Sequence, residues 1–139
     1  MSQPAFLVGR MLALADVLHA QYCTVVRGDN LPPQLLGNQH FVMASDRPER
    51  ALAVLGERLR IYQGWAATAK VNPESPEAAQ RGIRIARWAL ARMGEVTRQL
   101  EGRVPAGSFD DAGKAEMLLG YLSREAKDVV EEEGMESHV

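Results

Sequence analysis

Residues 75–100 read SPEAAQRGIRIARWALARMGEVTRQL, and this stretch predicts a long amphipathic helix. Ser75 is suited to cap the first free N–H groups, Pro76 suits the first helical position, and Glu77 favours the positive end of the helix dipole. Apolar residues that recur every three, four or seven positions form one stripe that is expected to be buried. These residues are Ala79, Ile83, Ala86, Leu90, Met93 and Leu100.

A second set of residues in the same stretch is predicted to point away from the core. At about 100° per residue, three arginines and one tryptophan fall together on the far side of the helix, and two more arginines flank them. We call this set the arginine face: Arg81, Arg84, Arg87, Trp88, Arg92 and Arg98. A tryptophan among arginines, away from the expected core, indicates a surface that binds a partner.

The composition is that of an ordinary globular protein. The chain has 139 residues, 46% hydrophobic and 24% charged, so a single domain with its own core is expected over residues 1–139. No apolar run has the length needed to cross a bilayer, and the N-terminus lacks the order of a signal peptide. The single cysteine, Cys23, excludes an intrachain disulfide and fits a reducing cytoplasm.

Charge is distributed unevenly along the chain. The net charge of −2 argues by itself against a nucleic-acid binder, but residues 1–104 hold 13 Lys+Arg against 9 Asp+Glu, whereas residues 105–139 hold 3 against 9. The chain can therefore carry a basic face and an acidic end. All but three of the 16 basic residues are arginine, which suits forked contacts to phosphate or carboxylate and stacking on flat rings.

Two further long helices are predicted before residue 75. The first covers about residues 4–25, and Gly9 within it suggests a close contact between helices. The second covers about residues 46–70, with Asp46 as its N-cap, Pro48 just inside and Glu49 in its first turn. A short connection makes it an antiparallel neighbour of the helix that follows. The apolar stripes are Leu7, Met11, Leu14, Leu18, Tyr22 and Val25 in the first helix, and Leu52, Leu55, Leu59, Tyr62, Ala66 and Ala69 in the second, with Trp65 at its edge.

A fourth long helix is predicted after a loop at residues 101–107. Ser108 is its expected N-cap, with Asp110 and Asp111 in the first turn. Its expected core face is Ala115, Leu118, Leu119, Leu122, Ala126 and Val129, and an acidic tail begins at about residue 131. With short helical turns in the loop of residues 26–46, these elements predict an all-α fold, a bundle of four long helices.

Motifs for catalysis or metal binding are not found in the sequence. There is no phosphate-cradling glycine loop, no nucleophile elbow and no pair of cysteine or histidine ligands. His19 is expected to be packed or hydrogen-bonded, Cys23 to be a small buried residue, and His40 has no partner at a metal-ligand spacing. We therefore expect no cofactor, no metal and no catalytic residue, and we do not expect an enzyme.

Two apolar helical stretches, each with a central glycine, carry a resemblance to a known family. Residues 4–14, PAFLVGRMLAL, are similar to the LGRL-x-A-x-L helix that opens the C-terminal region of the type I-C CRISPR large subunit. Residues 117–122, MLLGYL, resemble the LGYY signature of that region. The same region is also made as a separate chain, the small subunit of the Cascade complex. His19 and Arg124 stand where the family tends to carry glutamine.

The resemblance implies a non-catalytic subunit that lines the belly of an RNA-guided, cytoplasmic antiviral complex. Its partners would be the large subunit, the backbone subunits, other copies of itself, the guide RNA complex and the displaced single-stranded non-target DNA, with no membrane among them. Holding the backbone of that DNA would help to stabilise the R-loop. The family supplies no catalytic residue, so the expected DNA contacts come from the charge pattern: the arginine face, with Arg47, Arg58 and Lys70 as second choices.

The arginine face is also consistent with two roles that involve no nucleic acid. An arginine-rich helix surface can serve solubility alone, with local ion pairs to Glu77, Glu95 and Glu101. It can also be a protein interface, as in a helical adaptor that docks an acidic partner. In that case the acidic end of one copy would meet the arginine face of the next, in a heterologous contact that builds an open row. The acidic residues expected there are Glu125, Asp128, Glu131 and Glu132.

Overall fold

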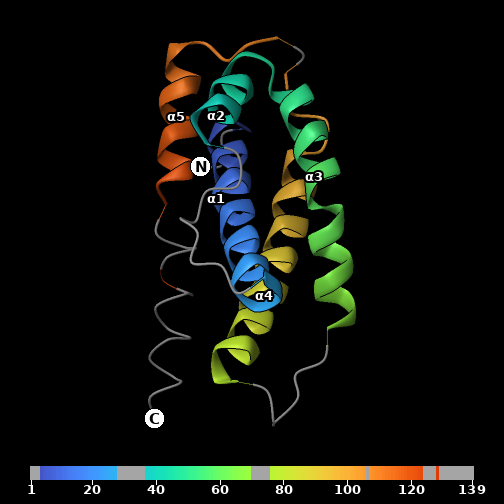
Figure 1. Ribbon diagram of the computed structural model, residues 1–139. Coiled ribbons are helices and arrows are strands. Elements are labelled where there is room, and N and C mark those ends of the chain that lie inside the picture. Colours follow the sequence, from blue (N-terminus) through green and yellow to red (C-terminus); the bar gives the residue numbers. More distant parts are fainter. Residues whose placement is uncertain (1–3, 28–36, 70–75, 106, 124–127, 129–139) are drawn as a thin grey trace.

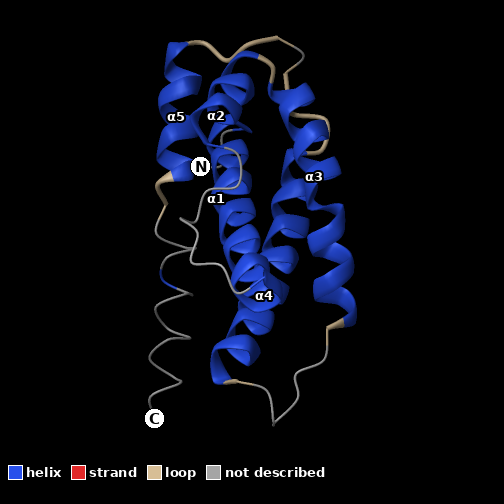
Figure 2. Ribbon diagram, viewed as in Figure 1, coloured by secondary structure: helices blue, strands red, loops and turns tan. Residues whose placement is uncertain are grey.

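The fold consists of helices joined by short connections. The computed structural model describes residues 4–27, 37–69, 76–105, 107–123 and 128 (Figure 1). Its α-helices are α1 (Pro4–Tyr22), α2 (Gly37–Asp46), α3 (Pro48–Thr68), α4 (Glu77–Leu100) and α5 (Asp111–Tyr121). The described residues contain no strand (Figure 2), so the prediction of an all-α helical bundle is confirmed.

α1 is the central helix of the bundle. It packs mainly against α4 and α5 and also contacts α3, while α5 and α3 form opposite edges of the molecule (Figure 1). Leu7, Leu14 and Leu18 of α1 are almost completely buried, because a helix with neighbours on several sides is apolar on several faces. α4 runs antiparallel to α3, as the sequence predicts, and α5 runs in the same direction as α1 (Figure 1).

The first connection contains a longer helix than the sequence predicts. α1 continues past Tyr22 as a π-helical segment, Cys23–Arg27, rather than as an α-helix to residue 25. Instead of short helical turns, the ten-residue helix α2 follows at Gly37–Asp46, and residues 28–36 lie outside the described part of the chain. In the ranges given above, no helix is both long enough and apolar enough to cross a membrane.

The predicted core stripes of α3 and α4 are largely confirmed. Leu55, Leu59 and Ala66 of α3 are buried, and so are Ile83 and Met93 of α4. The remaining members are buried in the case of Ala86 and Leu100, and half-buried in the case of Leu52, Tyr62, Ala69, Ala79 and Leu90. The spacing of apolar residues therefore gives the inward sides of these two helices correctly.

α3 and α4 both begin one residue after the predicted start. The N-cap position of α3 is Arg47, not Asp46, and no side chain caps this end. α2 continues through Asp46, and the N–H of Arg47 donates to the carbonyl of Met43 at 2.7 Å, so Asp46 does not have the extended backbone of a cap. Pro76 holds the N-cap position of α4, and Ser75 lies outside the described residues.

α5 also begins after a different cap from the predicted one. Asp110, not Ser108, is the N-cap, and its Oδ1 accepts a hydrogen bond from the N–H of Gly113 at 2.7 Å. The preceding residue, Phe109, is buried, and its N–H donates to the carbonyl of Ser45 at 2.9 Å. This contact ties the loop to α2, so the helix cannot begin before Asp110.

The predicted core face of α5 is wrong. Leu118, Leu119 and Leu122 are 45%, 57% and 62% exposed. α5 instead buries Met117 and Gly120 against α1. A glycine adds nothing to an apolar pattern, yet it allows the closest approach between two helices, and this contact sets the rotation of α5. Of the other predicted members, Ala115 is exposed, and Ala126 and Val129 lie outside the described residues.

Candidate nucleic-acid interface

Three members of the arginine face are exposed on α4: Arg84, Arg87 and Arg98. Arg84 and Arg98 are 14 residues apart in sequence, which corresponds to about four turns and about 21 Å along the helix, on nearly the same side. α4 as a whole carries five arginines and two glutamates. The helix therefore presents a positively charged surface long enough to follow several phosphates of one strand.

Arg87 has a structural contact that the sequence does not predict. Its Nε donates to the carbonyl of Ala66 at 3.1 Å, and a terminal nitrogen donates to the carbonyl of Ala69. These carbonyls belong to the last turn of α3 and the residue that follows it, where intrahelical donors run out. Arg87 thus caps the end of α3 and joins α3 to α4, so a phosphate would have to compete with this contact.

Arg92 forms one of the expected local ion pairs. Its guanidinium lies 2.6 Å from the carboxylate of Glu95, and the two side chains are 35% and 44% exposed. An exposed pair of this kind contributes a few tenths of a kcal/mol to stability, about 0.3. Arg81 is also half-buried. Arg81 and Arg92 therefore lie closer to the neighbouring helices than Arg84 and Arg98 do.

Trp88 does not lie away from the core, and this part of the prediction is wrong. Its side chain is half-buried and packs against the hydrophobic core. α1, α3 and the π-helical segment Cys23–Arg27 all contact α4, so the residues beside the main stripe are also partly covered. Arg81, Trp88 and Arg92 are all half-buried for this reason. The ring of Trp88 is mainly a part of the core packing, and only its exposed part could stack on a base.

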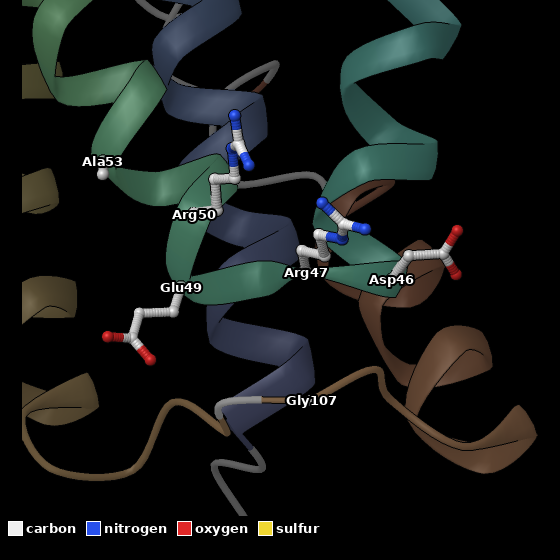
Figure 3. A pocket seen from close by; sticks show the side chains of 6 residues that line it. All are labelled: Asp46, Arg47, Glu49, Arg50, Ala53 and Gly107. Carbon is white, nitrogen blue, oxygen red and sulfur yellow. The ribbon is translucent and has the colours of Figure 1, made fainter.

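Arg47 and Arg50 lie beside a shallow surface pocket at the start of α3 (Figure 3). Asp46 and Glu49 line the same pocket, and so does Gly107 in the loop before α5. Two guanidinium groups thus share the pocket with two carboxylates, so it does not concentrate positive charge. The sequence prediction includes Arg47 but not Arg50, although their spacing of three residues places them near each other on a helix.

The remaining predicted contacts fall into two groups. Arg58 is exposed on α3, and Asp128 is exposed near the C-terminus. Lys70, Glu125, Glu131 and Glu132 lie outside the described residues. The structure thus brings Arg84 and Arg98 onto one side of α4, and it leaves the acidic end of the proposed head-to-tail contact undescribed except at Asp128.

A cluster of aromatic and titratable side chains joins α1 to α3. His19 Nδ1 lies 2.9 Å from the hydroxyl of Tyr62, and the Sγ of the buried Cys23 lies 3.7 Å from both ring nitrogens of His19. The ring of Tyr22 packs on Tyr62 and edge-on to Trp65, at centroid distances of 4.5 Å and 5.4 Å. The predictions of a hydrogen-bonded His19 and a buried Cys23 are therefore confirmed.

Among the described residues, no group of three or more His, Cys, Asp or Glu is arranged to hold a metal.

A second polar contact, between Tyr121 and Asp16, lies between α5 and α1. The hydroxyl of Tyr121 donates a hydrogen bond to the carboxylate of Asp16. Burial raises the pKa of Tyr121 well above its usual value, and both the hydrogen bond to Asp16 and the negative charge of that carboxylate raise the pKa further. Tyr121 is therefore a neutral donor at physiological pH, and this contact is part of the packing of α5 rather than of the basic surface.

Comparison with known proteins identifies no relative: no family model, no curated protein and no solved structure matches the chain. The class of this protein is therefore defined by its structure, an all-α helical bundle with a basic surface on α4.

Proposed function

We propose that this protein is a non-catalytic small subunit of an RNA-guided CRISPR type I Cascade complex. In this role it binds the backbone of displaced, single-stranded non-target DNA and helps to keep the R-loop open. Its protein partners are the large subunit, the backbone subunits and other copies of itself, next to the guide RNA complex, in the cytoplasm.

The observation that carries the proposal is the exposure of Arg84 and Arg98 along one side of α4. Arginines contact phosphates without reading base sequence, which is what a subunit that holds an arbitrary strand requires. Arg87 and Trp88 of the same surface have structural contacts, so the proposed contact set is narrower than the full arginine face.

The packing of α1 on α5 supports the family resemblance. The two stretches that carry it lie against each other, and Gly9 of the first lies against Met117 and Tyr121 of the second. Gly120 of the second stretch contacts Phe6 and Arg10 of the first in the same manner. The two glycines of the matching motifs therefore form one packing unit.

A helical adaptor that docks an acidic protein is the second candidate. The exposure of Leu118, Leu119 and Leu122 on α5 favours it, because neighbouring large apolar side chains on a surface mark contacts with protein more often than with DNA. The two candidates differ in their response to strand length, since only a backbone binder gains affinity as single-stranded DNA is lengthened.

The experiment is a binding titration with labelled single-stranded DNA of about 10 to about 40 nucleotides over a salt series. Wild type is compared with Arg84→Gln/Arg98→Gln. For single-stranded DNA each lost phosphate contact lowers the salt slope by about 0.7, so the double variant should lose about 1.4 from the slope of log K against log salt.

The matched control removes the same charge from the acidic part of the chain, in Lys114→Gln/Lys127→Gln. This control should keep the wild-type slope and affinity. Absence of binding by the wild type at low salt, or an equal loss of slope in both double variants, would show that α4 does not follow a phosphate backbone.

A further inference from the structure

The described part of the chain has an exposed apolar ridge at one edge of the bundle. Ala115, Leu118 and Leu119 of α5 and its C-cap residue Leu122 are all exposed, and we call this set the leucine ridge. The four positions follow the spacing i, i+3, i+4 and i+7, which is the spacing of the anchors that a helix inserts into a groove of a partner. The opposite side of α5 is already occupied by α1, through Met117 and Gly120.

An apolar groove lies between α3 and α4, near the end of the bundle where α4 ends. It encloses about 720 Å³, and we call it the α3–α4 groove. Leu55, Leu59, Met93 and Leu100 form its buried part, with Leu52 and Leu90 half-exposed at its edges. Apolar side chains that line an open groove are the usual receptor for a ridge of leucines.

Two glycines keep this groove open. Gly56 of α3 and Gly94 of α4 both line it, and a Cβ at either position would meet no atom within 4 Å. Glycine inside a helix costs about 1 kcal/mol relative to alanine, and no packing among the described residues requires it at these two positions. Because each wall of the groove has a glycine without a side chain, another helix has room to approach the backbone of both walls closely.

The charged residues that line the groove itself, Arg98 and Glu101, balance each other, whereas the helices that carry the groove and the ridge differ in net charge. α3 and α4, the helices that wall the groove, together carry eight arginines and four glutamates. α5 and its N-cap carry Asp110, Asp111 and Glu116 against Lys114. The electrostatic field therefore favours approach of α5 to the groove and disfavours pairing of two grooves.

We propose that the leucine ridge of one copy docks in the α3–α4 groove of a second copy. The inference rests on the part of the proposed function in which copies of the chain contact one another, and it does not depend on DNA binding. α5 and α3 lie at opposite edges of the bundle (Figure 1), so one copy cannot close the contact on itself. Such a heterologous contact leaves one ridge and one groove unoccupied at the ends, and it extends into an open row.

This contact differs from the one that the sequence predicts between the acidic tail and the arginine face. The ridge–groove contact is apolar at its centre and uses residues on α3, α4 and α5. The charges on these helices only orient the two copies as they approach. A variant of the tail, Glu131→Gln/Glu132→Gln, should therefore associate as the wild type does. Loss of association in this variant would assign the contact to the tail and overturn the proposal.

The test is the mass of the full chain in solution, measured by sedimentation velocity without DNA from about 10 μM to about 1 mM, the range of weak specific contacts. Two variants each remove one side of the contact. Leu119→Glu charges the ridge, and Gly94→Phe fills the groove. Each alone should weaken association by about tenfold or more.

The decisive sample is an equimolar mixture of these two variants. Leu119→Glu retains a groove and Gly94→Phe retains a ridge, so the mixture should form a 1:1 dimer that grows no further. If ridges instead pair with ridges, Gly94→Phe alone still dimerises and the mixture gains nothing. That result, or a wild type that is monomeric over the whole range, overturns the proposal.

Matched controls separate docking from loss of fold. Ile61→Glu introduces the same charge at an exposed apolar residue of α3, and Gly64→Phe adds the same ring at a glycine with open space outside the groove. Both should associate as the wild type does, and all variants should keep the helical circular dichroism signal. Arg98 lines the groove as well, so Gly94→Phe can also alter DNA binding, whereas Leu119→Glu leaves α4 unchanged. The DNA titration on Leu119→Glu is therefore the separate readout that distinguishes failure of docking from failure of DNA binding.

Discussion

Gly9 of α1 and Gly120 of α5 lie against each other's helices in a reciprocal contact. A Cβ at Gly9 would lie 2.0 Å from the carbonyl oxygen of Met117, and a Cβ at Gly120 would lie 2.0 Å from the carbonyl oxygen of Phe6. In both cases the obstacle is backbone, which cannot move aside as a side chain can. The two helices therefore touch at the distance that only glycine permits.

Gly9→Ala and Gly120→Ala are each expected to destabilise the fold. Alanine gains about 1 kcal/mol of helix propensity, but separating the helices to admit a methyl group costs more, so we expect a net loss of about 2 kcal/mol in the free energy of unfolding. Urea unfolding followed by circular dichroism measures the change. Gly64→Ala, where a Cβ meets nothing within 4 Å, should be neutral or stabilising. Equal stability of all three variants would contradict the close contact.

The sequence predicts this contact only in part. A glycine inside the apolar helix of residues 4–25 already suggests close packing, but its partner in α5 is not evident. The pattern of leucines in α5 points to the wrong side of the helix, because periodicity counts apolar side chains and gives no weight to Gly120. Leu118, Leu119 and Leu122 are exposed as a result. Their exposure is the kind of local conflict that marks an interface rather than a core.

The candidate nucleic-acid interface is also predicted only in part by the sequence. Periodicity places Arg84 and Arg98 on the outside of α4 correctly. It cannot show that Arg87 reaches carbonyls of α3 or that Trp88 packs on the core, because these contacts depend on how close α3 lies to α4. Helix spacing defines the sides of a helix, whereas the position of the neighbouring helix decides which of them are covered.

Arg87→Met is expected to lower stability without a specific effect on DNA binding. The variant removes two hydrogen bonds to the end of α3, at Ala66 and Ala69, and a charged donor to a carbonyl is worth about 1.5 kcal/mol. Thermal unfolding should show a lower midpoint. Arg58→Met on the exposed surface of α3 is the control and should change stability by less than about 0.5 kcal/mol. A salt slope for DNA that falls in Arg87→Met, with stability unchanged, would reverse this assignment.

Cys23 should react with thiol reagents only when the chain opens. The residue is 1% exposed, so alkylation of the native chain should be slower by about a hundredfold or more than that of the urea-unfolded chain. Mass spectrometry over a time course measures the rate. Cys23→Ala/Ser108→Cys places a single thiol at an exposed position and should react rapidly in the folded state. Equal rates for the two native thiols would contradict the burial of Cys23.

Tyr121→Phe is expected to change stability in two pH ranges. Near neutral pH the variant loses the hydrogen bond to Asp16, at a cost of about 1 kcal/mol. In the wild type the pKa of Tyr121 is raised in the folded chain, so the unfolded chain releases the proton first, near pH 10. The stabilisation is therefore complete below about pH 10 and is lost as pH rises toward the folded pKa, by about 1.4 kcal/mol per pH unit.

The measurement is urea unfolding of the wild type and Tyr121→Phe between about pH 7 and pH 11.5, a range that spans the ordinary titration of tyrosine. The wild type should lose stability more steeply above pH 10, so the gap between the two proteins narrows as the pH increases. The other tyrosines, Tyr22 and Tyr62, are present in both proteins and cancel in the difference. Parallel curves would mean that Tyr121 titrates alike in the folded and unfolded chains. In that case the contact with Asp16 does not hold α5 against α1.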